Sequence, residues 1–454
     1  MKDNILTLTI SSPEVTALTQ EDFASRRARL MDSLSDGAII LTAGHMATRN
    51  SDVEHEYRQD STFWYLTGFD EPDAVAVLRP GHEEHPYVLF VNPFDPKFEI
   101  WVGQRAGVDG AKQHLGADEA FPIEELEEKL PELLEETNTL YHSLGSDQEM
   151  DRLVTDLVKR RRSSGQRNGR YIQRVADPGI TIASMRVVKS AKEIESLQRA
   201  IDITAQGFDA AIRETRAGQR EYHIQTPLEN EFRRLGSPRN GYPSIVASGE
   251  NSCILHYIKN RRELQDGDLL LIDAGAEVDY YGADITRTWP VSGKFTPEQR
   301  DVYDIVLEAQ KKAIELIAPG VEFGDVHKKA REVLIQGLKD FGILKGDIDH
   351  IIEEKEHEPY YMHGTSHWLG LDVHDAGIYK NGDDSVLLQE GMVFTVEPGL
   401  YFGRQVEDAP EYLKGIGIRI EDDLVVTADG YRVMSSAIPK EPGDLEALVG
   451  MTAS

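Results

Sequence analysis

The chain has 454 residues, 40% apolar and 28% charged, and a formal net charge of −30. This composition is typical of a soluble globular protein, and the length predicts two domains. So acidic a chain disfavours nucleic acid and anionic membranes as partners, and no apolar run approaches the roughly 18 residues of a membrane span. A single cysteine, Cys253, excludes internal disulfides and favours a reducing compartment, so we expect a cytoplasmic location.

The first part of the chain alternates short apolar runs with turns, at residues 38–43, 74–80 and 86–91. With the helical patterns that flank them, these runs predict a small α/β domain over residues 1–186.

Two charged stretches lie in this predicted domain. The acidic stretch 124–136 predicts a solvated helical face that is broken at Pro131. The basic run Lys159–Arg162 could indicate a nucleic-acid patch, but a solvated surface loop fits so acidic a chain better.

The pattern changes after residue 186, where Ser190 and Glu193 form a capping box. A helix with one apolar face follows, made by Ile194, Leu197, Ile201, Phe208 and Ile212. A second helix is predicted to begin at Thr296-Pro297 and to stop at Pro319-Gly320. We therefore expect a second domain over residues 187–454 and an α/β (α+β) fold class.

Five side chains of the second domain share an unusual context: Asp273, Asp284, His367, Glu397 and Glu421. Three of the acids end apolar runs, where a buried carboxylate costs several kcal/mol without a proton, a counter-charge or a metal. Ordinary strand-end caps explain any one acid better. Together, interleaved with glycines, the five carry a charge of about −4, which two divalent cations would cancel.

The expected geometry brings two of these acids together. If the turn after Asp273 centres on Val278-Asp279, Asp273 and Asp284 lie directly opposite each other, with Cβ atoms about 5 Å apart. Arg419 and Glu421 are two residues apart on one strand and share a face. The arginine could therefore hold that carboxylate or a substrate.

Several segments of the chain resemble the pita-bread metallopeptidases, and among them the Xaa-Pro aminopeptidases, also called aminopeptidase P. In the second domain these are MHGTSHWLGLDVHD, TVEPGLY, GIGIRIEDD and SGENSCILHY, and in the first YRQDSTFWYLTGFDEPDAV and EIWVGQR. The resemblance implies a small N-terminal α/β domain and a C-terminal pita-bread catalytic domain. Only the segment after Tyr242 departs from the family pattern, where the chain is two residues shorter.

The resemblance implies a set of site residues. Its metal ligands fall on Asp273, Asp284, His367, Glu397 and Glu421, and its other active-site residues on His256, His363, His374, Tyr401 and Arg419. Glu397 would act as general base, and Tyr401 is a candidate wall of the proline pocket. Two divalent ions would share a bridging hydroxide. The oxygen-rich ligands favour manganese, with cobalt or zinc as alternatives.

The implied activity is removal of the first residue from peptides with proline in second position. Two alternatives are a prolidase that cleaves Xaa-Pro dipeptides and a non-catalytic peptide-binding module, although such modules typically lose metal ligands. A homo-oligomer, dimer or tetramer, is also implied. Trp101 is a candidate contact in it, or else a buried core tryptophan.

Two other features could mimic a site. His82 and His85 are one position too close for an H-E-x-x-H zinc motif, so a surface loop is expected there. Cys253 could be a nucleophile beside His256, but a small buried residue in a strand over residues 252–255 is the simpler interpretation.

Overall fold

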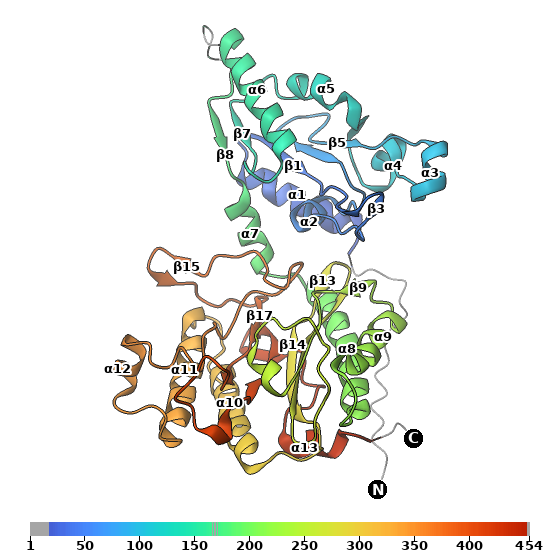
Figure 1. Ribbon diagram of the computed structural model, residues 1–454. Helices are drawn as coiled ribbons and strands as arrows, with labels where there is room; N and C mark the ends of the chain where they lie inside the picture. Colours follow the sequence, from blue (N-terminus) through green and yellow to red (C-terminus); the bar gives the residue numbers. More distant parts are fainter. Residues whose placement is uncertain (1–17, 166, 168, 170, 452–454) are drawn as a thin grey trace. The chain divides into compact units, whose positions relative to one another are not determined.

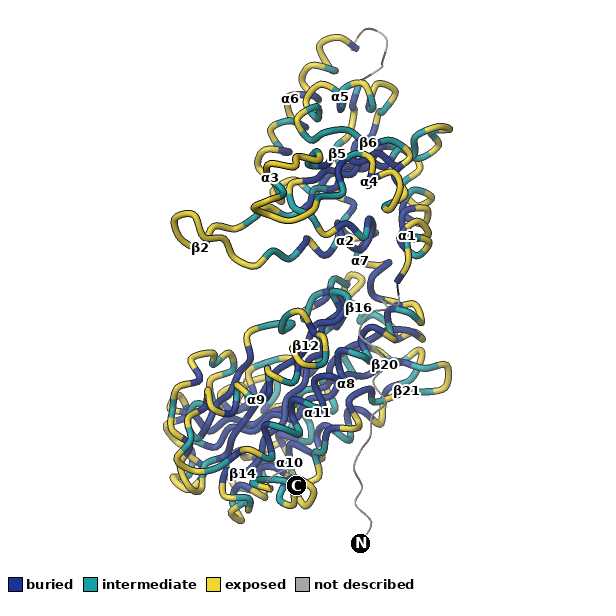
Figure 2. The backbone as a smooth tube through the Cα atoms, turned by 90° about the vertical axis from the view of Figure 1, so that its right-hand side faces the viewer, coloured by how far each residue is buried: buried dark blue, intermediate teal, exposed yellow. Residues whose placement is uncertain are grey.

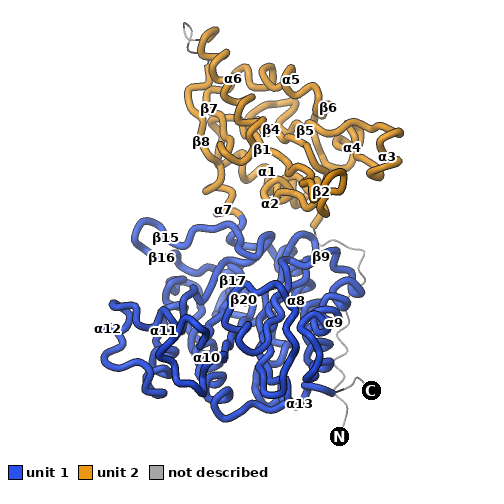
Figure 3. The backbone as a smooth tube through the Cα atoms, in the orientation of Figure 1, with its two compact units in different colours: residues 1–17, 186–454 blue, residues 18–185 orange. Residues whose placement is uncertain are grey.

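The computed structural model describes residues 18–165, 167, 169 and 171–451. These residues form two compact units, one over Leu18–Met185 and one from Arg186 onward (Figure 3). The sequence predicted a division between residues 186 and 187. None of the described helices is long and apolar enough to cross a bilayer.

The first unit is built on a six-stranded mixed sheet in the order β6-β5-β4-β1-β7-β8. Strands β1, β4 and β5 pair antiparallel, whereas β6, β7 and β8 join in parallel. The strands are β1 (Gly37–Thr42), β4 (Val75–Leu78), β5 (Tyr87–Val91), β6 (Glu119–Pro122), β7 (Thr139–Tyr141) and β8 (Arg174–Ala176), beside an exposed hairpin of β2 (Thr48–Asn50) and β3 (Val53–Glu54). The three predicted strands are confirmed.

Seven helices lie in or at the end of this unit, and two of them correct the sequence predictions. They are α1 (Gln20–Ser33), α2 (Ser61–Thr67), α3 (Pro96–Val102), α4 (Gly107–His114), α5 (Leu126–Leu133), α6 (Gln148–Gly165) and α7 (Gly179–Val187), with a 3₁₀ turn at Ile123–Glu125. Pro131 does not break the acidic helix, because it lies inside α5, and Leu130 and Leu134 on either side are fully buried. The basic run Lys159–Arg162 lies on α6, so it is a helix surface and not a loop.

The second unit carries two pairs of long helices (Figure 1). The expected caps are confirmed: Ser190 and Glu193 form a capping box at the start of α8, and Thr296 caps α10. Helix α10 ends at Ile314, before the predicted stop at Pro319-Gly320. The helices are α8 (Ala191–Glu214), α9 (Glu221–Arg234), α10 (Pro297–Ile314), α11 (Phe323–Asp340), α12 (Ile348–Glu353) and α13 (Pro442–Leu448).

Small antiparallel sheets fill the interior of the second unit, where β12 and β14 are buried along their whole length (Figure 2). One sheet has the order β10-β11-β14, and others the orders β13-β12-β9, β17-β20-β21 and β18-β19. Their bounds are β9 (Arg239–Asn240), β10 (Ile245–Ser248), β11 (Leu269–Ala274), β12 (Ala276–Val278), β13 (Tyr281–Gly282), β14 (Ile285–Pro290), β17 (Val393–Val396), β18 (Gly399–Tyr401), β19 (Gly417–Arg419), β20 (Asp422–Thr427) and β21 (Gly430–Val433). A further hairpin pairs β15 (Lys380–Asn381) with β16 (Asp384–Ser385), and 3₁₀ turns lie at Gly249–Cys253 and Glu411–Leu413.

The hairpin after β11 has a different register from the predicted one. Its turn centres on Asp279-Tyr280, which both have positive φ, 50° and 68°, as a tight primed turn requires. Asp273 therefore lies opposite Thr286, and the prediction that it lies opposite Asp284 is wrong. Asp284 lies two positions closer to the turn than Thr286 does.

A second pair of acids meets between the β17–β20 pairing and the β18–β19 pairing. Val396 pairs with Asp422, and Gly399 pairs with Arg419. Because both pairs follow one antiparallel register, Glu397 and Glu421 lie opposite each other in the gap between them. Packing behind β17 and β20 comes from an apolar cluster that includes Trp368, Phe394 and Leu424 with residues of α10 and α11.

Candidate metal centre

The predicted site residues come together around one cavity of about 300 Å³ in the second unit. Nine of the ten line it: Asp273, Asp284, His367, Glu397, Glu421, His256, His363, His374 and Arg419. They come from four parts of the chain: the hairpin β11–β14, the segment before β17, the paired ends of β17 to β20 and, for His256, the loop after the 3₁₀ turn Gly249–Cys253. Residues far apart in sequence thus share one polar pocket, as a binding site requires.

Three of these residues could hold one metal ion. Asp284, His367 and Glu421 offer an imidazole nitrogen and two carboxylate oxygens that all lie within 4.8 Å of one another. Among the described residues, no other group of three or more such side chains comes as close. Oxygen donors with one imidazole suit a divalent metal ion, so the residues present fit a metal site of the kind that the sequence predicts.

The imidazole of His367 is oriented for such a role. Its Nδ1 lies 3.1 Å from the carbonyl oxygen of Trp368, which leaves Nε2 facing the acids, 3.2 Å from Asp284 and 3.5 Å from Glu397. Burial alone would lower the pKa of His367, but the hydrogen bond and charge of Asp284 outweigh it and raise the pKa to about 9. A backbone bond to the other ring nitrogen is how proteins fix a ligating histidine.

The carboxylates are crowded and buried. Burial is the main cause that raises the pKa of Asp273, Glu397 and Glu421, and the neighbouring acids add to it. Two cationic side chains face this group, the protonated His367 and Arg419, whose Nη2 donates to Asp273 at 2.5 Å. Four acids therefore exceed the positive charge that the cavity lining supplies, and divalent cations would balance the remainder.

Arg419 contacts a different acid from the one the sequence suggested. It shares a strand with Glu421, but its guanidinium bonds Asp273, the hydroxyl of Tyr401 at 3.1 Å and Thr286 at 3.1 Å. Thr286 in turn donates to Glu421 at 2.6 Å. The threonine therefore joins the arginine to Glu421.

Tyr242 is a site residue that the sequence analysis missed. Its hydroxyl lies 2.5 Å from both Asp273 and Asp284, so it links the two acids that the hairpin does not place opposite each other. Thr286 was missed for a related reason. Both are neutral side chains whose positions depend on tertiary structure, and neither stands out in the sequence.

His363 and Tyr401 form a second polar chain at the cavity. Burial lowers the pKa of His363 to about 3, so the ring is neutral. Its Nδ1 lies 2.7 Å from the carbonyl of Gly364, and Nε2 lies 2.8 Å from the Tyr401 hydroxyl. Tyr401 is fully buried and is not among the residues that line the cavity, and in this structure its hydroxyl supports the His363 ring.

The two remaining histidines lie at the rim. His256 and His374 are exposed, and the ring of His374 stands edge-on to that of His367, with centroids 4.4 Å apart. Partial burial lowers the pKa of His374. A neutral histidine at the mouth of the cavity can accept or donate a hydrogen bond to a bound peptide.

Comparison with known proteins agrees with this geometry. Residues 195–428, more than half of the chain, match the model of metallopeptidase family M24. The chain belongs to metallopeptidase family M24. Residues 23–141 match the aminopeptidase P N-terminal domain, which confirms a small α/β domain followed by a pita-bread catalytic domain.

Individual members of the family are similar over nearly the whole chain. Xaa-Pro aminopeptidase of Escherichia coli is 43% identical, and the match covers 96% of this chain and 99% of that protein. Among solved structures, aminopeptidase PepP of Pseudomonas aeruginosa has a TM-score of 0.92 at 42% identity, covering 96% of this chain and 98% of that one. Zinc-substituted E. coli aminopeptidase P in complex with product has a TM-score of 0.91 at 43% identity, covering 95% and 98%.

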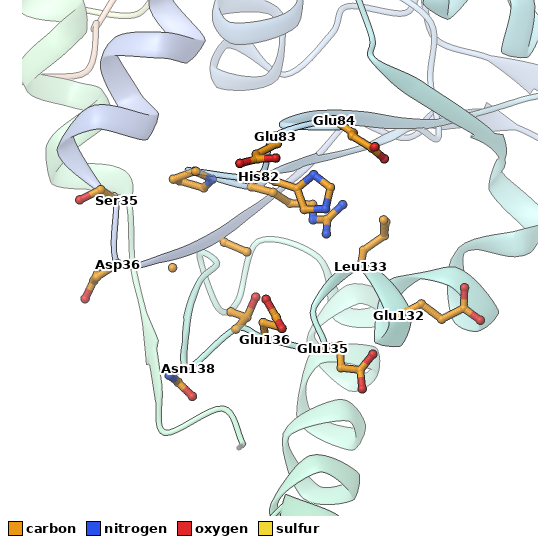
Figure 4. Close-up of a pocket in the computed structure, with 16 residues that line it drawn as sticks. Ser35, Asp36, His82, Glu83, Glu84, Glu132, Leu133, Glu135, Glu136 and Asn138 are labelled. Atoms are coloured by element: carbon orange, nitrogen blue, oxygen red, sulfur yellow. The ribbon is translucent and has the colours of Figure 1, made fainter. Parts of the chain in front are cut away.

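Two other features of this M24 metallopeptidase do not form a site. Cys253 lies in a 3₁₀ turn and not in the predicted strand, and burial raises its pKa to about 12, so the thiol stays protonated. His82 and His85 lie in the loop between β4 and β5, as predicted. His82 lines a separate cavity of about 750 Å³ in the first unit, which holds none of the predicted site residues (Figure 4).

Proposed function

We propose that this M24 metallopeptidase is an Xaa-Pro aminopeptidase, which removes the first residue from peptides with proline in second position. The observation that carries the proposal is the convergence of four acids, four histidines and one arginine on one cavity of about 300 Å³. The name and near-complete coverage of the E. coli relative support the same substrate class.

We assign Asp273, Asp284, His367, Glu397 and Glu421 as ligands of two divalent ions, with manganese as the metal and cobalt or zinc as alternatives. Support comes from the donor set, four carboxylates and one imidazole, and from the burial that raises the pKa of three of the acids. When bound, such ions supply a nucleophilic water at neutral pH and a Lewis acid for the peptide carbonyl.

The protein's own groups would carry the proton transfers. Glu397 lies beside His367 with a raised pKa, so it can accept a proton from the attacking water and return it to the departing proline nitrogen. That nitrogen leaves as a secondary amine and needs this proton. His256 and His374, exposed at the rim, can hydrogen-bond the substrate carbonyl or the leaving nitrogen.

The neighbouring polar chain would orient the substrate. Arg419 holds the Tyr401 hydroxyl, which donates to Nε2 of His363, so the ring is held at the cavity surface in one tautomer. A ring fixed in this way presents the same edge to every substrate. We assign His363 as a substrate-positioning group on this ground.

The assay that tests the proposal compares a tripeptide Xaa-Pro-Yaa with a dipeptide Xaa-Pro, after chelation and after manganese is added back. Metal-dependent release of the first residue from the tripeptide is the expected result. Cleavage of the dipeptide alone would identify a prolidase. Metal binding with cleavage of neither would leave a peptide-binding module.

We also propose that the chain forms a homo-oligomer, dimer or tetramer, through its first unit. Helix α3 has no buried residue, and its Ile100 and Trp101 are 80% and 83% exposed, so the alternative of a buried core tryptophan is wrong. Neighbouring apolar side chains that are this exposed indicate a surface that another subunit covers. The acidic composition and single cysteine favour a cytoplasmic location.

A further inference from the structure

A polar clamp lies next to the candidate metal centre, made of three side chains that do not line the cavity: Tyr361, Thr365 and His327. Its middle member is Thr365, which is fully buried between the two histidines of the segment His363–His367. The Thr365 hydroxyl lies 2.5 Å from the hydroxyl of Tyr361 and 2.9 Å from Nδ1 of His327. His327 comes from helix α11, so the clamp ties the ligand-bearing segment to a long helix.

Hydrogen bonding satisfies all three groups at once. Burial lowers the pKa of His327 to about 4, so the ring is neutral, and its Nδ1 accepts or donates according to the tautomer. With Nδ1 as the acceptor, Thr365 donates to His327 and Tyr361 donates to Thr365; with Nδ1 as the donor, both bonds reverse. In either case the Thr365 hydroxyl joins the other two groups.

The main chain carries this anchoring to the site. The segment that bears Thr365 runs antiparallel to β17, since Leu369 donates to Val393, Thr395 donates to His367, and Glu397 donates to the carbonyl of Thr365. The last of these bonds is 2.7 Å long. Thr365 is therefore the point where the segment reaches Glu397, the proposed general base.

We infer that Thr365 and His327 are positioning residues, which hold His367 and Glu397 in register so that both can serve one centre. Neither lines the cavity, so neither contacts the substrate. Without the Thr365 hydroxyl, the segment loses its side-chain tie to helix α11, so the Glu397 carboxylate and the His367 imidazole are held less firmly relative to each other. The inference rests on the proposed roles of His367 and Glu397.

The variants isolate the hydroxyl from the bulk of the side chain. Thr365→Val removes the hydroxyl at similar volume, and Thr365→Ser restores it. His327→Leu removes the other partner, whereas His327→Asn keeps a polar atom near the position of Nδ1. Thr67→Val is the matched control, because Thr67 is a fully buried threonine of the first unit whose hydroxyl also makes two hydrogen bonds.

Two readouts separate positioning from simple stability: the dissociation constant for manganese, by chelator competition, and kcat and KM on the tripeptide at saturating metal. Thr365→Val and His327→Leu should each weaken manganese binding and lower kcat by about tenfold, with a smaller change in KM. The serine and asparagine variants should stay within about threefold of the parent. The double variant should be no worse than either single one, since both break the same clamp.

Thr67→Val should lower the melting temperature without changing either readout. Unchanged manganese affinity and kcat in Thr365→Val and His327→Leu, with only the melting temperature reduced, would overturn the inference and leave the proposed function intact. A parent protein that neither binds manganese nor cleaves the tripeptide would overturn both, and this is seen before any variant is compared.

Discussion

Arg419 and Asp273 form a buried ion pair at the edge of the candidate metal centre, with Nη2 and Oδ2 2.5 Å apart. The same guanidinium donates to the hydroxyls of Tyr401 and Thr286, so Arg419 hydrogen-bonds three side chains at the centre. It is the one arginine of the cavity lining, and it meets an acid that we assign to the metal.

Replacing Arg419 with methionine should therefore destabilise the metal-depleted protein by about 3 kcal/mol, because Asp273 loses its cationic partner inside the protein. Manganese should recover part of this loss, since it supplies a counter-charge to the same carboxylate. Thermal unfolding with and without manganese measures both effects. Arg404→Met is the matched control, because the Arg404–Glu250 pair is exposed, and its loss should cost about 1 kcal/mol or less. An equal effect of the two variants would contradict this assignment.

Glu397→Gln should reduce turnover by about a thousandfold or more while the protein remains folded, because an amide cannot accept the proton from water. Asp273→Asn should likewise abolish turnover by weakening metal binding. Activity and circular dichroism of each variant check the result, with exposed Glu390→Gln as the control. Near-normal turnover in either site variant would exclude the proposed proton path or ligand set.

Removing metal should lower thermal stability, because the buried acids lose their counter-charges. Ligand binding stabilises a folded protein by about 2.7 kcal/mol at a free concentration 100 times the dissociation constant. Melting curves after chelation and after manganese is restored measure this difference. If the two curves coincide over a range of manganese concentrations, the acids hold no ion.

The metal-depleted protein should lose stability as the pH rises from about 6 to 9. The pKa of His367 is raised to about 9 in the folded chain, against roughly 6.5 when unfolded, so its contribution is complete below the lower value and disappears as pH passes the upper one. The raised pKa values of Asp273 and Glu421 act in the same direction, because the folded protein holds their protons more tightly.

Manganese affinity should rise over the same pH range, because binding displaces these protons. Unfolding of the chelated protein at several pH values, together with manganese titrations, tests both trends. If the stability of the chelated protein stays constant or rises with pH, the folded protein does not hold these protons more tightly than the unfolded chain.

Trp101→Glu should reduce the assembled mass of the protein if α3 is a subunit contact. A charge placed at an exposed apolar position of an interface is costly to bury, whereas on a free surface it is harmless. Light scattering after size exclusion gives the mass. Ile180→Glu provides the control, since Ile180 is also exposed, at 72%, but lies outside α3. A monomeric parent, or an unchanged mass in Trp101→Glu, would rule out this contact.

The sequence was sufficient to predict which charged residues meet, because three of the acids end apolar runs and the family resemblance supplies the other residues. Asp273 is the fifth residue of a strand whose six residues are all buried, and Glu421 is 1% exposed at the end of an apolar run. Carboxylates in such places need compensation, so their number predicted a cation. The capping boxes of α8 and α10 were predicted for an equally local reason.

The pairing of these residues could not be predicted from local patterns. The hairpin turns at Asp279-Tyr280 in a left-handed conformation that tyrosine rarely adopts, so the turn lacks the usual Asn-Gly signal and the predicted register was wrong by two residues. Tyr242, in the loop between β9 and β10, and Thr286, in β14, reach the acids only because tertiary packing brings these parts of the chain together. The partner of Arg419 was missed for the same reason.

The most direct test of the account is the release of the first residue from an Xaa-Pro-Yaa tripeptide while manganese is titrated into chelated protein, with bound metal counted in parallel. The account predicts no turnover at the start, a rise that saturates at about two ions per chain, and no turnover by Glu397→Gln at equal occupancy. Full turnover by the chelated protein, or two bound ions with no cleavage of the tripeptide, would contradict it.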